Sequence, residues 1–209
     1  MKKSLFVAIE GIDRSGKSSL VASLKRSLQK KGFQASAINY PNRQSHTGKL
    51  ISEVLSGKHT IAKEAMHLLF SANRWEDKAR LEGLLRNSEE PGSLPTVILC
   101  DRYILSGVSY SIANGLPEKF CTFSDKGMLE PDLTIFLDVP PATVETRSGF
   151  GEELYENREF QEKVYSSMKQ LLAAYRHKRI LNASQEEVHA ISLKCILDLM
   201  EENTGAISV

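Results

Sequence analysis

Short apolar runs and longer amphipathic stretches follow one another along the chain. The apolar runs predict β-strands at Ser4–Glu10, Phe33–Tyr40, Thr96–Cys100, Asp132–Val139 and Arg179–Asn182. The third run is Thr-Val-Ile-Leu-Cys, an almost unbroken apolar sequence that is typical of a strand buried on both faces. Strands of this kind belong to the interior of a parallel sheet.

Between the strands, apolar residues recur at helical spacing. Leu20, Leu24 and Leu28 lie four residues apart, and Gly32 ends the helix that they predict. Further helices are expected at about 47–56, 61–86, 105–126, 141–147 and 157–175, and after the N-cap residue Ser184. This alternation predicts an α/β fold, with a five-stranded parallel sheet flanked by helices on both faces.

Residues 1–209 are expected to form one domain, because this length is usual for a single α/β unit with its own core. Pro and Gly are frequent around 90–95, which we interpret as a surface loop rather than a boundary. Gly149 and Gly151 interrupt two predicted helices. They predict a short lid at about 147–157 that closes over a ligand.

A phosphate-binding motif follows the first predicted strand. Gly11-Ile12-Asp13-Arg14-Ser15-Gly16-Lys17-Ser18 matches G-x-x-x-x-G-K-[ST] between a strand and a helix, where this pattern forms a P-loop. Backbone N–H groups would bind phosphates, Lys17 would bridge the outer ones and Ser18 would hold Mg²⁺. We therefore predict a P-loop NTPase fold that uses ATP and Mg²⁺, with cofactor-binding residues Gly11, Asp13, Arg14, Ser15, Gly16, Lys17, Ser18 and Ser19.

Charged residues follow two other predicted strands. Arg43 comes after the second strand, and Asp101 and Arg102 come directly after the third. Because the carboxyl ends of parallel strands line one crevice, these residues should converge beside the P-loop. The arginines predict a polyanionic acceptor, and Asp101 lies where P-loop enzymes place a residue that orients Mg²⁺ through water. No N-K-x-D motif is present, so a small-molecule kinase is favoured over a GTPase.

Overall charge and cysteine usage exclude several other classes. With 27 basic and 26 acidic residues the net charge is +1, which gives no global attraction to nucleic acid or membrane. The three cysteines are widely spaced and form no CxxC pair, which suits a reducing compartment and argues against zinc. The first apolar run is too short for a signal-peptide core. A cytoplasmic protein without a membrane or nucleic-acid partner is expected.

Two segments resemble signatures of the thymidylate kinase family, in its eukaryotic and poxvirus-like branch. They are Leu68-Leu69-Phe70-Ser71-Ala72-Asn73-Arg74-Trp75-Glu76 and Asp101-Arg102-Tyr103 followed by Ser106-Gly107-Val108, and the likeness extends over about Leu5–Met200. It implies transfer of the γ-phosphate of ATP to dTMP, giving dTDP and ADP, by a homodimer. Trp75 is expected in the core.

The resemblance also implies roles for individual residues. Arg43 and Arg102 would bind the dTMP phosphate, Phe70 would stack on thymine and Arg74 would hydrogen-bond the base edge. Asp13 would meet the 3′-hydroxyl, Tyr155 would crowd the 2′ position and Arg147 would lie over adenine near Asn182. The implied substrate-binding set is Asp13, Tyr40, Arg43, Phe70, Arg74, Arg102, Tyr110 and Tyr155.

Two positions depart from the family pattern. Asn42 replaces the usual glutamate after Pro41, so no catalytic role is assigned to it. Leu154 replaces a basic lid residue, which leaves Arg14, inside the P-loop, as the arginine expected to act on the migrating phosphoryl group. The predicted catalytic residues are Arg14, Lys17, Asp101 and Arg102, with Ser18 and Asp101 at the metal.

Alternative functions stay open from the sequence. A kinase of another nucleoside monophosphate would share these motifs. A deoxynucleoside kinase would need a carboxylate base for a neutral hydroxyl, and Glu10 is the obvious candidate. A nucleotide-binding scaffold without catalysis is disfavoured because Arg14, Lys17, Ser18 and Asp101 are all present.

Overall fold

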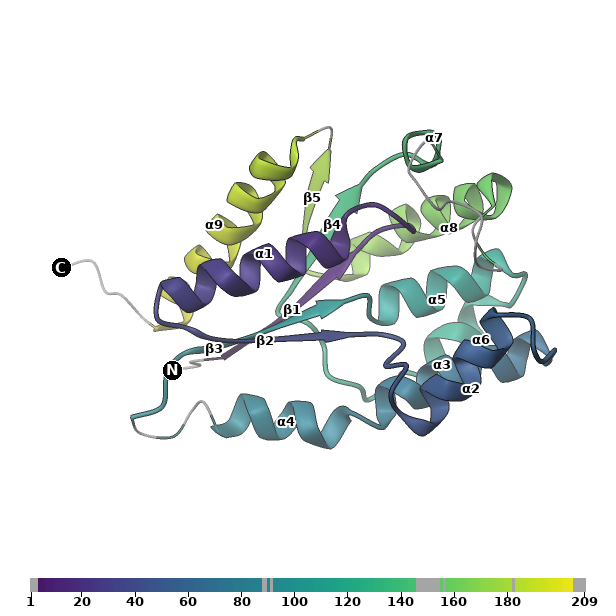
Figure 1. Cartoon of the computed structure of the whole chain (residues 1–209), viewed down its shortest axis with the longest axis horizontal. Coiled ribbons are helices and arrows are strands. Elements are labelled where there is room, and N and C mark those ends of the chain that lie inside the picture. The colour runs from purple at the N-terminus through teal and green to yellow at the C-terminus, as the bar shows by residue number, and fades with distance from the viewer. Residues whose placement is uncertain are drawn as a thin grey trace.

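A computed structural model (Figure 1) describes residues 4–87, 90, 92–145, 155, 157–181 and 183–204. Five parallel strands form one sheet in the order β2-β3-β1-β4-β5, which confirms the predicted architecture. The strands are β1 (Ser4–Glu10), β2 (Gln34–Asn39), β3 (Thr96–Asp101), β4 (Leu133–Asp138) and β5 (His177–Leu181).

Burial of the strands follows their place in the sheet. Every residue of β1 and β4 is buried, as are the first five of β3, because helices cover both faces of these central strands. The edge strands β2 and β5 are mostly exposed or half-buried. Ile9 pairs with Asp101, so β1 and β3 end side by side where the P-loop begins.

Helices cover the two faces of the sheet as two separate layers. On one face, Leu5 and Val7 pack against Leu24 of α1 (Lys17–Lys30) and Ile196 of α9 (Gln185–Thr204). Figure 1 shows these two helices side by side. The other face is covered by α4 (Lys78–Asn87), α5 (Ile104–Ala113) and α8 (Arg158–Leu171).

Four further helices and a 3₁₀ turn complete the described part of the chain. At one end of the molecule, α2 (His46–Leu55), α3 (Lys63–Trp75) and α6 (Glu118–Phe123) gather beyond the carboxyl ends of β2 and β3 (Figure 1). A single turn, α7 (Pro141–Val144), follows β4, and a 3₁₀ turn (Leu172–Ala174) follows α8. In the part of the chain that is described, no helix combines the length and apolar composition needed to cross a bilayer.

Two predicted helices are each divided in the structure. The helix expected at 61–86 breaks at Glu76 and Asp77, whose carboxylates accept hydrogen bonds from Thr47 and Tyr40 across the fold. The helix expected at 105–126 stops before Gly115, which has φ 83° and ends α5. The hydrophobic periodicity of the sequence continues across both breaks, so it does not predict either of them.

Candidate active site

The P-loop joins β1 to α1 and depends on glycine at two points. Gly11 has φ 150°, and a Cβ there would lie 2.8 Å from Ser15 Oγ and 2.9 Å from the Leu137 carbonyl. Gly16 has φ 102° and immediately precedes the first residue of α1. Both positions favour glycine, because side chains rarely adopt these angles.

Lys17 is buried under the loop, with 5% of its surface exposed. Its Nζ donates to the Ile12 carbonyl at 2.6 Å and to Ser15 Oγ at 3.4 Å. The pKa of Lys17 is lowered to about 7, chiefly by burial and also by the nearby Arg102 guanidinium, while neighbouring carboxylates act in the opposite sense. An anion at this position would restore the charged ammonium.

Ser18 and Asp101 meet at the ends of two neighbouring elements. Ser18 Oγ donates to Asp101 Oδ2 at 2.5 Å, across a sequence separation of 83 residues. Asp101 is the last residue of β3 and Ser18 lies in the first turn of α1, so the parallel sheet brings them together. The structure thereby pairs the two residues that the sequence predicts at a metal.

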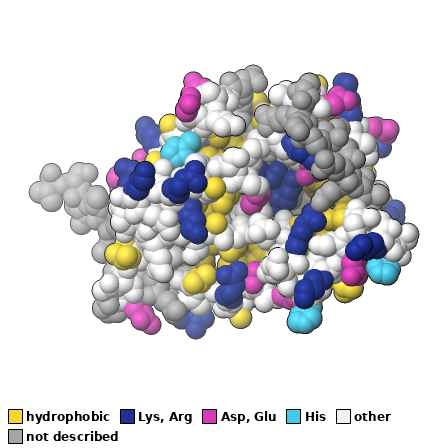
Figure 2. Space-filling view, in the orientation of Figure 1, with side chains coloured by type: hydrophobic (Ala, Val, Ile, Leu, Met, Phe, Trp, Pro, Cys, Tyr) yellow, Lys and Arg dark blue, Asp and Glu magenta, His cyan; other side chains and the backbone are white. Residues whose placement is uncertain are grey.

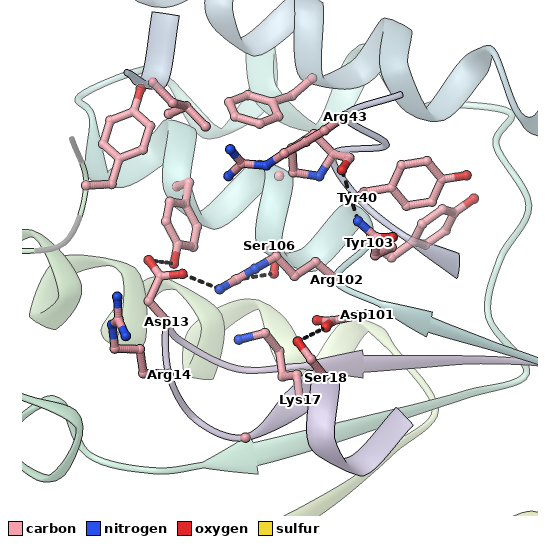
Figure 3. Close-up of a pocket in the computed structure, with 18 of the residues that line it drawn as sticks. Asp13, Arg14, Lys17, Ser18, Tyr40, Arg43, Asp101, Arg102, Tyr103 and Ser106 are labelled. Atoms are coloured by element: carbon pink, nitrogen blue, oxygen red, sulfur yellow. Dashed lines mark hydrogen bonds and ion pairs between the residues drawn. The ribbon is translucent and has the colours of Figure 1, made fainter. Parts of the chain in front are cut away.

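A cavity of about 610 Å³ opens beside these groups. Figure 2 shows Lys and Arg side chains in and around a hollow on this face, and in Figure 3 the charged ends of Arg43, Arg102 and Lys17 point into the cavity. It is lined by every residue that we predict to bind substrate: Asp13, Tyr40, Arg43, Phe70, Arg74, Arg102, Tyr110 and Tyr155. Arg14, Gly16, Lys17, Ser18, Ser19 and Asp101 also line it.

A second cavity, of about 540 Å³, lies on the other side of the P-loop. It shares Gly16, Ser19 and Gln185 with the first and is also lined by Ser15 and Ala183. The P-loop thus lies between two cavities, as a phosphate site between two nucleotides would.

Asp13 lies at the centre of a hydrogen-bond network that the sequence does not reveal. Its carboxylate accepts from Arg102 Nη2, from the Tyr110 hydroxyl at 2.6 Å and from Gln161 Nε2 at 2.8 Å. Burial would raise the pKa of Asp13, but Arg102 and Lys17 together lower it. Gln161 also donates to the Tyr155 carbonyl at 2.9 Å. The signal for Gln161 is a glutamine on the buried stripe of α8 with Val164 and Met168.

Glu10, the carboxylate considered as a possible base, has another role. It is fully buried and accepts hydrogen bonds from the backbone N–H of Tyr103 at 2.8 Å and of Ser106 at 3.2 Å, and from the Ser106 hydroxyl. Burial raises the pKa of Glu10, and these hydrogen bonds, which lower it, offset only part of that effect. Glu10 is not among the residues that line the cavity, and it caps the N-terminus of α5.

Arg74 reaches the cavity wall as half of a buried ion pair. Its Nε and Nη2 donate to Asp125 at 3.0 and 2.6 Å, and Nη1 lies over Gly107, where an added Cβ would approach to 2.5 Å. Asp125 is not among the site residues predicted from the sequence. The expectation that Trp75 lies in the core is wrong: its ring is 37% exposed, and its Nε1 donates to the Ser124 carbonyl.

Some predicted positions lie outside the described residues or outside the cavity lining. Arg147, Gly149, Gly151, Leu154 and Asn182 lie outside the described residues. Within the predicted lid, Tyr155 is described and stacks on Phe160, with ring centroids 4.9 Å apart. Asn42 does not line the cavity, and its side chain accepts from the Gln44 N–H at 3.2 Å.

Comparison with known proteins identifies relatives of this chain. The sequence model of the thymidylate kinase family matches residues 9–192. Thymidylate kinase of Arabidopsis thaliana is 37% identical over 204 residues, covering 97% of this chain and 74% of its own length. The Homo sapiens enzyme is 35% identical over 175 residues, covering 82% and 78%.

A solved structure extends the similarity to three dimensions. Thymidylate kinase from Candida albicans superimposes with a TM-score of 0.77 at 30% identity, covering 96% of this chain and 92% of that one. The chain therefore belongs to the thymidylate kinase family, whose members are ATP-dependent kinases that phosphorylate dTMP to dTDP.

Proposed function

We propose that dTMP binds in the larger cavity with its base toward Phe70 and Arg74 and its phosphate between Arg43 and Arg102. The observation that carries this assignment is the convergence of both arginines with Lys17 on one cavity (Figure 3). Phosphate binding needs such a cluster of cations, and an aromatic ring at the far side suits a planar base. ATP would bind its phosphates at the P-loop and its nucleoside in the second cavity.

In the proposed mechanism the chain positions two polyanions and compensates their charge. Lys17 would contact the outer phosphates of ATP, and Arg14, which lines the cavity and has φ 57°, would act on the migrating phosphoryl group. Arg102 would orient the acceptor phosphate. No general base is needed because that phosphate is already anionic, and the burial of Glu10 agrees with this.

The metal site proposed for Mg²⁺ consists of Ser18 and Asp101. Their oxygens lie 2.5 Å apart at the mouth of the P-loop, and hydroxyl and carboxylate oxygens are donors that Mg²⁺ accepts, so the residues fit this ion. When bound, Mg²⁺ supplies charge neutralisation to the phosphates. Ser18 would bind it directly, and Asp101 would orient its water.

A coupled assay tests the proposed acceptor site. We expect ATP-dependent turnover with dTMP and far less with thymidine, because thymidine offers no phosphate to Arg43 and Arg102. Arg43→Ala should raise the KM for dTMP by about tenfold or more while the KM for ATP stays unchanged. Equal turnover of thymidine and dTMP, or an unchanged KM in the variant, would overturn the assignment. Activity with dUMP and dGMP would measure how selective the pocket is.

We also propose that the chain forms a homodimer through α3 and α6. Leu68 and Trp75 lie two helical turns apart on one face of α3 and are 49% and 37% exposed, and Phe123 at the end of α6 is 73% exposed. Large apolar side chains exposed on two neighbouring helices favour a protein interface. Light scattering should give twice the 23.3 kDa of one chain, and Leu68→Glu should halve that mass. A monomeric wild type would contradict the proposal.

The cytoplasm is the compartment that we propose. Cys100, Cys121 and Cys195 are all free thiols in the structure, and Cys100 and Cys121 are buried. Free thiols are usual in a reducing environment. A fluorescent fusion found in another compartment would refute this proposal.

A further inference from the structure

The loop that carries Arg43 is held by one buried side chain, that of Asn73 on α3. Asn73 Oδ1 accepts from the Asn42 N–H at 2.7 Å. Its Nδ2 lies within hydrogen-bond distance of the Asn42 carbonyl at 3.3 Å, Ser45 Oγ at 2.8 Å and Thr47 Oγ1 at 2.8 Å. Asn73 is 1% exposed and its partners are half-buried, so these contacts are partly shielded from water, which strengthens them.

These contacts bracket Arg43 on both sides. Asn42 precedes it, and Ser45 follows it and caps α2 by accepting from the Gly48 N–H at 3.1 Å. A Cβ at Gly48 would lie 1.8 Å from the Asn42 carbonyl, which shows how closely the loop packs on the first turn of α2. The backbone at Arg43 is thereby fixed relative to α3.

A fixed backbone at Arg43 has a consequence for binding. A long arginine side chain on a mobile loop loses conformational entropy when it binds phosphate, and holding its backbone in advance reduces that loss. We propose that Asn73 is a positioning residue that holds Arg43 toward the acceptor phosphate. This inference rests on the proposed function, in which Arg43 contacts that phosphate.

A positioning role predicts a specific relationship between the effects of Asn73 and Arg43 on the binding free energy. Asn73 acts through Arg43, so removing Asn73 should matter only while Arg43 is present, and only for ligands that carry a phosphate. If Asn73 merely stabilised the fold, its removal would weaken the binding of every ligand and would do so whether or not Arg43 is present. A double-mutant cycle separates the two cases.

The experiment measures dTMP and thymidine binding calorimetrically for wild type, Asn73→Leu, Arg43→Ala and the double variant. We expect Asn73→Leu to weaken dTMP about 10–100-fold, to leave thymidine unchanged and to add little to Arg43→Ala. Thr47→Val, an isosteric change that removes one of the Asn73 contacts, should give a smaller loss in the same direction and keeps the test valid if Asn73→Leu folds poorly. Leu199→Ala, a buried site on α9, is the control for general destabilisation and should leave dTMP binding unchanged.

Three results would overturn the inference. Additive losses from Asn73→Leu and Arg43→Ala, or equal losses for thymidine and dTMP, would show that Asn73 has only a structural role and would leave the proposed function standing. Unchanged dTMP binding by Arg43→Ala would refute the phosphate role of Arg43, and the inference with it.

Discussion

Arg74 and Asp125 form a bidentate ion pair in which both side chains are only 2% exposed. The Nε–Oδ1 and Nη2–Oδ2 distances are 3.0 and 2.6 Å, and Ser71 Oγ adds a hydrogen bond to Oδ1 at 2.9 Å. The positive charge of Arg74 is therefore neutralised inside the protein. It can contact an uncharged base without leaving an unpaired charge buried.

Asp125→Ala should destabilise the protein by about 3–5 kcal/mol, because it leaves the Arg74 guanidinium buried and unpaired. Urea unfolding measures this loss. Arg80 is the matched control: it forms a similar two-bond pair with Asp77 but is 51% exposed, so Arg80→Ala should change stability by less than about 1 kcal/mol. Similar losses in the two variants would show that burial of the pair is unimportant.

Gly107→Ala should impair dTMP binding, because its Cβ would lie 2.5 Å from Arg74 Nη1 and displace the guanidinium. We expect the KM for dTMP to rise about tenfold, with the KM for ATP unchanged. Gly83→Ala on α4 is the control, since a Cβ there meets nothing within 4 Å, and it should leave both constants unchanged. An unaffected KM in Gly107→Ala would contradict the proposed contact of Arg74 with the base.

Arg14→Ala should lower kcat by about 10²–10⁵-fold while dTMP binding is largely kept, as expected for an arginine that acts on the migrating phosphoryl group. Steady-state kinetics with calorimetric binding of dTMP measures both effects. Arg158→Ala, at an exposed site that pairs with Glu162, is the control and should retain full activity. A kcat for Arg14→Ala within about threefold of wild type would refute the role.

ATP binding should take up a proton through Lys17 above neutral pH. In the free enzyme its pKa is lowered from 10.5 to about 7, so the amine is largely neutral at pH 8, and bound phosphates would raise the pKa again. ATP binding therefore adds a proton to Lys17 at any pH between the pKa of the free enzyme and the higher pKa of the complex. The affinity for ATP should fall as the pH rises through 7.

Calorimetry in buffers of different ionisation enthalpy measures that proton. Uptake at pH 8 should exceed uptake at pH 6, and Lys17→Met should abolish the difference. Equal uptake by wild type and Lys17→Met at pH 8 would show that Lys17 is already charged in the free enzyme.

Tyr155→Ala should narrow the preference for deoxyribonucleotide over ribonucleotide acceptors, since the ring is predicted to crowd the 2′ position. The ratio of kcat/KM for dTMP and its ribonucleotide counterpart measures the change. Tyr155→Phe keeps the ring that packs on Phe160 and should keep the ratio. If Tyr155→Ala also leaves the ratio unchanged, another group excludes the 2′-hydroxyl.

The sheet and part of the cavity lining could be predicted from local sequence signals, whereas Phe70, Arg74, Tyr110 and Tyr155 were expected only from the resemblance to the thymidylate kinase family. Apolar runs mark the strands, and the carboxyl ends of parallel strands converge by topology, which is why Arg43, Asp101 and Arg102 were expected beside Lys17. These arguments need only the order of elements along the chain.

Residues that hydrogen-bond to the cavity-lining side chains or to their loops could not be predicted in this way. The side chains concerned, Asp125, Asn73 and Gln161, contact residues that are 26 to 148 positions away in the sequence. The hydrophobic periodicity of a sequence does not indicate which partner a buried polar side chain will contact. Glu10 was noticed, but as a possible base. Only its burial and its hydrogen bonds to Tyr103 and Ser106 identify it as a helix cap.

Asn73 and Arg74 are neighbours on α3, yet one holds the loop of Arg43 and the other faces the cavity beside Asp125. If Arg43 meets the phosphate and Arg74 meets the base, a single rigid helix sets the distance between the two ends of the acceptor. The helix then fixes the spacing between the base and the accepting phosphate: dTMP would reach both Arg43 and Arg74, whereas thymidine, which has no phosphate, would reach Arg74 alone. Redesign of the base pocket on α3 would have to preserve that spacing.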